Sequence, residues 1–528
     1  MYFINLPTDT IENTKYKKLV KKTYLKFIYD LFEACLGKNH GYNSQDVIDV
    51  EIDILNAMGC NSVANESSEF YNLIKKEEAL SKYGFDWEKF SKYLGYKKTP
   101  DTFVSNNLSY LKCICKILNE EWKTKKWETY WLYIHFRQIC RLDMKNRHIP
   151  YKFLKEFLQG RIEIVPAPIF TIFGLTNTFN HFLSDEYEKK FLNKQKIDFV
   201  RKFSNDLLNT FKKIIRYHTT WLSDKTKKYA LLKLKKLKII VGKPDNLRED
   251  PILDYKEDDA YGNMLIIGKW KTEQYINLNG KPVIDIPDFN WRNIRMSGTQ
   301  CYIVNAFYTP STNSIYIPLG YIQKPFVDLE ERGIEYNLST IGYTLCHEMC
   351  HALDDMGSKY SYDGNLYNWW SNEDLKKYNA IMEDIIEQYK VFAKRDGIDY
   401  NASLAIGESI ADISAIRICQ EYLANFQDRN KDIAPISNLS FQAFFIYYAV
   451  IQKQFVNKRA VVNQLITNPH PLSKYRTNIP LSRIGLFRSI YNIKKNDGMW
   501  WNNDCSLWDE GCKNVTKNKS IKNKPDTK

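Results

Sequence analysis

A short segment in the second half of this 528-residue chain constrains its fold and chemistry more than any other feature. Residues 346–355 read CHEMCHALDD, so His347 and His351 are four positions apart and Glu348 lies between them. In an α-helix, residues four apart share one face, and their two imidazoles can bind one metal ion. Glu348 projects near the same ion and can act as a general base on a bound water. The alternative is a helix that carries two histidines by chance.

The residues around this motif support a helix with one buried side. Apolar residues recur on a single stripe opposite the histidines, namely Leu338, Ile341, Leu345, Met349 and Ala352. Such a stripe packs against a core and leaves the other side of the helix free. We therefore expect the histidines to point away from the packed side.

Zinc catalysis needs three protein ligands and one open position. The metzincin pattern would require glycine at position 354 and histidine at position 357, but the chain has Asp354 and Gly357, which excludes that class. A glutamate from a later helix is the other common solution. The segment GESIADISAI (407–416) offers Glu408 as a ligand, and Asp412, four residues further on, as an acceptor for a ligand histidine. The same spacing alone is typical of a solvated helix face.

Helical periodicity dominates the rest of the chain. Mixed segments with few breakers cover residues 47–58, 107–122 and 196–222. In residues 302–320, two apolar runs flank the turn sequence TPSTNS, which predicts a β-hairpin. Helical patterns then return to about residue 495. The fold class we predict is mainly α with a small β-sheet.

The formal charge of +14 raises the question of a nucleic-acid partner. Much of the excess is local, because residues 225–238 hold seven lysines and no acid, and the tail after Cys512 holds six lysines and one acid. We interpret the first run as the solvated face of a helix and the tail as disordered. Finger, RNA-recognition and P-loop motifs are absent, so we predict no specific nucleic-acid partner. A basic nucleic-acid-binding protein is the alternative.

The sequence also gives expectations about the cellular localisation of the protein. No apolar run approaches the roughly 20 residues that span a bilayer, and the first 18 residues lack the pattern of a signal peptide. The eleven cysteines are scattered and show no zinc-ribbon spacing. We expect a soluble, intracellular protein without a membrane span. Release by an unconventional route, packaging into a virion and the oligomeric state stay open.

Six sequence blocks occur in a fixed order. They are TTWLSDKTKKYALLKLKKLKIIVGKPD (219–245), VNAFYTPSTNSIYIPLGYIQKPF (304–326), CHEMCHALDDMGSKYSYDGNLYNWW (346–370), GESIAD (407–412), NPHPLSKYR (468–476) and CSLW (505–508). Together, the blocks resemble the neprilysin and endothelin-converting enzyme family of zinc metallopeptidases, which belongs to the thermolysin-like gluzincins. The resemblance runs from about residue 200 to residue 508.

The resemblance implies a complete catalytic site. One Zn²⁺ ion per chain would be held by His347, His351 and Glu408. Glu348 would be the general base for the zinc-bound water, and Asp412 would orient a ligand histidine.

The resemblance also implies a substrate-binding set. His470 would stabilise the oxyanion, and Arg476 would hold the substrate carbonyl. Asn305 and Ala306 would pair with the substrate backbone. The pocket for the residue after the cleaved bond would be lined by Tyr321, Phe326, Tyr343 and Thr344.

The implied architecture is a thermolysin-like catalytic unit (261–508) covered by a helical N-terminal lobe (1–260) that is shortened relative to the family, followed by a basic tail (509–528). The implied function is hydrolysis of oligopeptides on the amino side of bulky hydrophobic residues. A catalytically inactive relative that binds peptides is the alternative. The family's usual partner for the C-terminal cysteine is missing, because residues 371–407 contain no cysteine. We therefore expect Cys505 to lack that partner, which favours a reducing compartment.

Overall fold

The structure is a computed structural model that describes residues 11–58, 71–176, 178–244, 247, 249–281, 300–430, 437–456, 461, 464–465, 468–510, 512 and 515. Its contacts divide the chain into two compact units. The described residues of 1–178 and 251–286 form the first unit, and those of 179–250 and 287–528 form the second. This division differs from the single boundary expected near residue 260, because residues 179–250 pack with the second unit. Most of the expected basic tail (509–528) lies outside the described residues.

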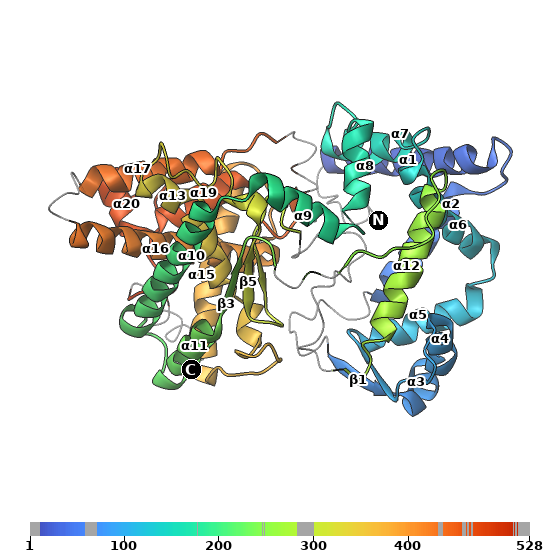
Figure 1. Cartoon of the computed structure of the whole chain (residues 1–528), viewed down its shortest axis with the longest axis horizontal. Coiled ribbons are helices and arrows are strands. Elements are labelled where there is room, and N and C mark those ends of the chain that lie inside the picture. The colour runs from blue at the N-terminus through green and yellow to red at the C-terminus, as the bar shows by residue number, and fades with distance from the viewer. Residues whose placement is uncertain are drawn as a thin grey trace, which may run out of the picture. The chain divides into compact units, whose positions relative to one another are not determined.

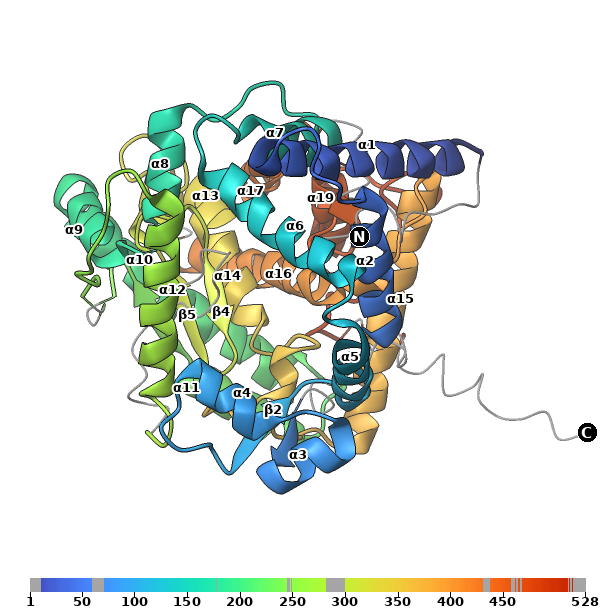
Figure 2. The same ribbon diagram turned by 90° about the vertical axis from the view of Figure 1, so that its right-hand side faces the viewer.

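The first unit is a set of helices with one two-stranded sheet. Its helices are α1 (Ile11–Leu36), α2 (Ser44–Met58), α3 (Lys76–Tyr83), α4 (Trp87–Leu94), α5 (Leu108–Glu121), α6 (Lys125–Leu142), α7 (His148–Tyr151), α8 (Ala167–Leu175) and α12 (Ala260–Ile276). Strands β1 (Asn72–Lys75) and β2 (Thr102–Ser105) pair antiparallel. Helices α1, α2 and α6 pack side by side (Figure 2). In their core, the buried Tyr24 hydroxyl donates to Glu51 at 2.7 Å and lies 2.9 Å from that of Tyr133.

The second unit carries every site residue expected from the sequence. Its helices are α9 (Asn180–Phe191), α10 (Lys194–Lys213), α11 (Asp224–Lys236), α13 (Ile334–Asn337), α14 (Tyr343–Cys350), α15 (Asn372–Arg395), α16 (Ile406–Arg429), α17 (Ser437–Ile451), α19 (Ser473–Ser482) and α20 (Gly485–Ile490). Many apolar side chains of these helices join one continuous hydrophobic core. Helix α16 contacts α10, α14, α15 and α19, and therefore occupies a central place in the unit.

A three-stranded sheet packs within the second unit (Figure 1). Its strands are β3 (Lys238–Val241), β4 (Phe307–Thr309) and β5 (Ser314–Ile317), in the order β3-β5-β4. Strand β5 pairs parallel with β3 and antiparallel with β4, which confirms the predicted hairpin. Asn313, at φ 46°, makes the tight turn before β5. Within the described ranges, β4 pairs only with β5, so its outer edge is an edge of the sheet.

The HExxH helix is the end of a longer helical run. Helix α13, a π-helical turn at Leu338–Gly342 and helix α14 follow one another without a break. The five residues of the predicted apolar stripe are fully buried, which confirms that this side packs into the core. Helix α14 lies between strand β4 and helix α16 (Figure 2).

Three expectations from the sequence concern the fold class, membrane-spanning helices and Cys505. The mainly helical class with a small β-sheet is confirmed. In the part of the chain that the structure covers, no helix combines the length and the apolar character needed to cross a membrane. Cys505 forms a disulfide with Cys512, so its partner differs from the family's usual one, as expected, but the cysteine is not free. The partner is local in sequence, so the missing cysteine between 371 and 407 gives no ground for a reducing compartment.

A buried arginine ties the C-terminal segment to α15. The Arg483 side chain is fully buried, and it donates to Gln388 Oε1 at 2.6 Å, to the Cys505 carbonyl at 2.9 Å and to Asp384 Oδ2 at 2.8 Å. A buried ion pair that loses one partner leaves an uncompensated charge and unpaired acceptors.

We expect Arg483→Met to lower the free energy of unfolding of the second unit by about 3–5 kcal/mol. Urea denaturation followed by tryptophan fluorescence measures this loss. The control is Lys189→Met, which removes an exposed ion pair with Glu186 and should shift the midpoint little. Equal shifts of the urea midpoint in both variants would contradict a stabilising role for the buried Arg483 contacts.

Candidate active site

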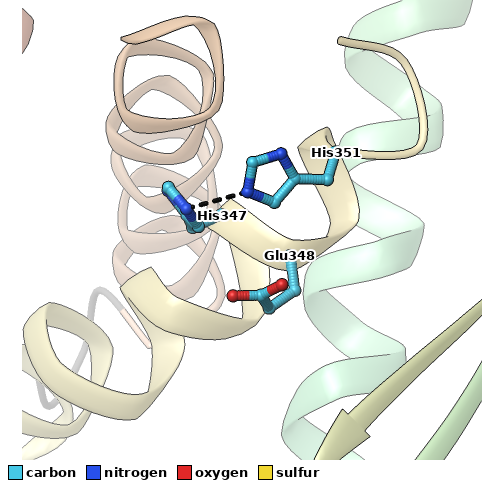
Figure 3. Close-up of side chains that lie close together, drawn as sticks. All are labelled: His347, Glu348 and His351. Atoms are coloured by element: carbon cyan, nitrogen blue, oxygen red, sulfur yellow. Dashed lines mark hydrogen bonds between the residues drawn. The ribbon is translucent and has the colours of Figure 1, made fainter. Parts of the chain in front are cut away.

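Helix α14 places the two histidines of the motif on one side. His347 and Glu348 lie in its last turns, and His351 directly follows the helix. Figure 3 shows the two imidazoles facing each other, with the Glu348 carboxylate on the same stretch of helix. The Nε2 atoms of His347 and His351 are 3.0 Å apart. The His347 and Glu348 side chains are both buried, so these polar groups need partners close by.

Helix α16 brings the third expected ligand to the same point. Glu408, in its first turn, has its Oε2 atom 3.1 Å from His347 Nε2 and 3.8 Å from His351 Nε2. The preceding residue is glycine, and a Cβ at Gly407 would lie 2.6 Å from Asp355 Oδ1, so a larger residue would require this carboxylate to shift. This glycine therefore lets the first turn of α16 approach the segment that follows α14.

The geometry of these three side chains fits zinc. Tetrahedral zinc with ligands at roughly 2.0–2.1 Å separates them from one another by about 3.3 Å. The three separations here, 3.0, 3.1 and 3.8 Å, fall on either side of that value. Glu408 Oε2 is buried and, among the described residues, has no donor in proper hydrogen-bond geometry. The two Nε2 atoms contact each other, and Glu408 Oε2 adds a buried carboxylate oxygen without a hydrogen-bond donor in the part of the chain that the structure describes, so the three atoms match the ligand set of a cation.

Asp412 holds His347 from behind. One turn beyond Glu408 on α16, its Oδ1 atom lies 2.9 Å from His347 Nδ1. The same carboxylate accepts two hydrogen bonds of 2.8 Å from Arg476 and one of 2.5 Å from the Tyr343 hydroxyl. Burial alone would raise the pKa of Asp412, but Arg476 outweighs it and keeps the carboxylate ionised. Asp412 therefore favours a proton on Nδ1 and leaves Nε2 free to bind a metal.

The pKa of His347 reflects the negative charge around it. Burial lowers the pKa of this imidazole, but the nearby carboxylates of Asp412 and Glu408 outweigh burial and raise the pKa to about 10. The carboxylates around His347 thus favour a positive charge at the place where a cation would bind.

His351 has its own carboxylate, which the sequence analysis did not assign. The His351 Nδ1–H group donates to Asp354 Oδ2 at 2.6 Å, while Asp354 Oδ1 accepts from the backbone amides of Met356 and Gly357 at 2.9 and 2.6 Å. Gly357 is required here, because a Cβ would lie 1.8 Å from the His351 carbonyl oxygen. The only signal in the sequence was an aspartate three residues after the second histidine.

A cavity of about 480 Å³ opens at these side chains. Its lining comprises Asn305, Ala306, Phe307, Tyr308, Pro310, His347, Glu348, His351, Asp354, Asp355, Met356, Gly357, Leu404, Gly407, Glu408, Pro469 and His470. His470 is 41% exposed, and its Nε2 atom is 3.1 Å from Glu408 Oε2. The structure thus brings the expected ligands, the expected base and His470 to one cavity.

The remaining expected substrate residues occupy three places. Asn305 and Ala306 line the cavity just before strand β4. Arg476 and Tyr343 belong to the hydrogen-bond network around Asp412. The other three form a separate cluster, in which the Tyr321 and Phe326 rings stack at 4.4 Å and the Tyr321 and Thr344 hydroxyls lie 2.8 Å apart. As the described part of the chain forms it, the cavity lining does not include this cluster, Arg476 or Tyr343.

Two family models match the chain. Both are described as peptidase family M13; one matches residues 3–244 and the other residues 305–507. The first match extends the similarity almost to the N-terminus, well before the motif blocks that start near residue 200.

Individual relatives agree with these matches. An endothelin-converting enzyme homolog of Locusta migratoria is 27% identical over 58% of this chain and 42% of that protein. Neprilysin-2 of Drosophila melanogaster is 24% identical over 92% of this chain and 65% of that protein. A zinc metalloproteinase of Acanthamoeba polyphaga mimivirus is 27% identical over 80% and 65%, respectively. The chain thus spans between two fifths and two thirds of the length of these relatives.

Solved structures share the fold. The zinc metalloprotease of Mycobacterium tuberculosis in complex with an inhibitor gives a TM-score of 0.79 at 22% identity, covering 95% of this chain and 76% of that one. PepO of Lactobacillus rhamnosis gives 0.78 at 20% identity, covering 94% and 75%.

A mainly helical unit in which an HExxH helix meets a glutamate from a later helix is the arrangement of the gluzincin class. The two family matches identify the family within this class: the chain belongs to peptidase family M13. The resemblance to the neprilysins and endothelin-converting enzymes is confirmed.

We expect Asp412→Asn to weaken zinc binding by about 10- to 100-fold, because the substitution removes the charge that fixes the His347 tautomer. Competition with a chromophoric chelator measures the affinity. The matched control is Asp374→Asn, since Asp374 is also buried in the second unit but accepts hydrogen bonds from Ser223 and Ser371. Unchanged zinc affinity in Asp412→Asn, or an equal loss in the control, would contradict this role.

Proposed function

We propose that the chain is a zinc-dependent endopeptidase that hydrolyses oligopeptides on the amino side of bulky hydrophobic residues. The observation that supports this most is the convergence at the cavity. Two imidazole nitrogens and one Glu408 oxygen lie within 3.0–3.8 Å of one another. The Glu348 carboxylate lies beside them and is not needed as a ligand. Three ligands with a free neighbouring carboxylate suit hydrolysis better than a purely structural site.

One Zn²⁺ ion per chain, held by His347, His351 and Glu408, would polarise the scissile carbonyl and acidify a water molecule. In our proposal, Glu348 accepts a proton from the attacking water and later delivers it to the leaving amine, so that one carboxylate serves both steps. The imidazole of His470 donates a hydrogen bond to the oxygen that becomes negative.

The substrate backbone would pair with the edge of the small sheet. Strand β4 directly follows Asn305 and Ala306, and both residues line the cavity beside the metal ligands. An extended peptide added to such an edge is recognised through its main chain, which tolerates varied side chains. Arg476 gives two of its five N–H groups to Asp412, and another is proposed to bind a substrate carbonyl.

The preference for bulky apolar residues rests on an aromatic cluster. The Tyr321 and Phe326 rings stack, and the Tyr321 hydroxyl is hydrogen-bonded to the Thr344 hydroxyl. Thr344 lies one turn before Glu348 on α14. We assign these residues, with Tyr343, to the pocket for the residue after the cleaved bond. Aromatic walls favour apolar side chains because both surfaces leave water on binding.

We expect the zinc-loaded protein to cut a mixed peptide library before Phe, Leu, Ile and similar residues, as read by mass spectrometry. Glu348→Gln should lower the rate by about 10²- to 10⁴-fold while zinc stays bound, because general base catalysis is lost. The control is Glu387→Gln, an exposed glutamate of α15, which should keep the wild-type rate.

If the zinc-loaded wild-type protein cut no peptide, this result would contradict the proposal and favour a relative that binds peptides without cutting them. Cleavage that survives in Glu348→Gln would contradict the role of Glu348 alone.

A further inference from the structure

The lysine-rich helix contains one lysine that does not fit a solvated face. Of the seven lysines in residues 225–238, five are exposed and Lys227 is half-buried, which agrees with the interpretation from sequence. Lys233 is fully buried. On the buried side of α11 it accompanies Thr226, Ala230 and Leu234. An ammonium group in such a place costs stability unless its hydrogen bonds are satisfied.

The partners of Lys233 lie in the segment that follows the HExxH helix. Its Nζ atom donates to the carbonyl oxygens of Gly357 at 2.5 Å and Tyr360 at 2.8 Å. Both acceptors are backbone carbonyls. Burial lowers the pKa of Lys233 to about 7, while the nearby Asp354 favours the charged form. These two hydrogen bonds join Lys233 to both ends of a short turn.

That turn is the one that positions Asp354. The amide of Gly357 donates to Asp354 Oδ1 at 2.6 Å, and Asp354 Oδ2 accepts from His351 Nδ1 at 2.6 Å. Gly357 thus binds Lys233 through its carbonyl and Asp354 through its amide. A continuous path of short hydrogen bonds runs from α11 to a metal ligand, although α11 itself lies outside the cavity lining within the described residues.

From this path we infer that Lys233 is a positioning residue of the zinc site. Its ammonium group holds the Gly357–Tyr360 turn, the turn holds Asp354, and Asp354 orients His351 toward the metal. The inference rests on the proposed function only in that it takes His351 as a zinc ligand. An apolar side chain of similar length could fill the space but could not hold the two carbonyls, and buried charges seldom add stability over apolar replacements.

The test is a double-mutant cycle read by the rate of zinc release to an excess of chelator, with no peptide present. The variants are Lys233→Met, Asp354→Asn and the double variant. We expect Lys233→Met to release zinc about 10-fold faster or more, as is typical when the support of a ligand histidine is lost. Because Lys233 acts through Asp354, the double variant should release zinc within about twofold of Asp354→Asn alone.

A matched control separates positioning from the stability of the helix. Asp374→Asn loosens the other end of α11, where Asp374 accepts hydrogen bonds from the backbone and side chain of the capping residue Ser223. We expect this control to lower the urea midpoint but to leave zinc release within about twofold of wild type. The inference would be overturned if Lys233→Met released zinc at the wild-type rate, or if the control released zinc as fast as Lys233→Met. It would also be overturned if the fold-increases of the two single variants multiplied in the double variant.

A second variant and a separate activity measurement complete the test. If Lys233→Met does not fold, the cycle is run with Lys233→Gln, whose amide can still donate to one carbonyl but carries no charge. Wild-type zinc binding and peptide cleavage are measured separately. A wild type that binds zinc but cuts no peptide would contradict the proposed function and leave the cycle valid.

Discussion

The buried carboxylate of Asp412 is the interaction on which the second unit depends most. A fully buried charge costs several kcal/mol unless it is paired and hydrogen-bonded. Asp412 lies on α16, and its partners come from two other helices, namely Tyr343 and His347 from α14 and Arg476 from α19. Satisfying this one charge fixes how the three helices meet. Because Glu408 lies one turn before Asp412 on α16, the same packing also brings the third ligand to the histidines.

The two ligand histidines are supported in different ways. His347 is held by Asp412 from a distant helix, so its position depends on tertiary packing. His351 is held by Asp354, only three residues away, so its position depends on a tight turn stabilised by Gly357 and Lys233. Substitutions in the core should therefore act first on His347, and substitutions around α11 should act first on His351. The metal would join these two supports into one rigid site.

Local patterns carried much of the prediction from sequence. The HExxH spacing and the buried stripe follow from helical periodicity, and the hairpin follows from its turn residues, so these features needed no tertiary information. Glu408 could be offered as the third ligand because it follows an HExxH motif, but ExxxD alone is common on solvated helix faces, and the family resemblance made the assignment specific. Asp354 was missed because it lies in an irregular turn, where periodicity says nothing. Lys233 was missed because a run of lysines does not reveal which one faces the core. The disulfide of Cys505 was missed because the resemblance places the usual partner between residues 371 and 407, whereas Cys512 is only seven residues away.

Zinc K-edge X-ray absorption on the metal-loaded protein tests the central claim most directly. Cys346 and Cys350 flank His347 and Glu348 in sequence but are fully buried on the packed side of α14, so they should not reach the metal. The account predicts one zinc per chain with two imidazole ligands and only nitrogen and oxygen neighbours, at about 2.0–2.1 Å. A sulfur neighbour at about 2.3 Å, a single imidazole, or a purified protein that holds no stoichiometric zinc would contradict it.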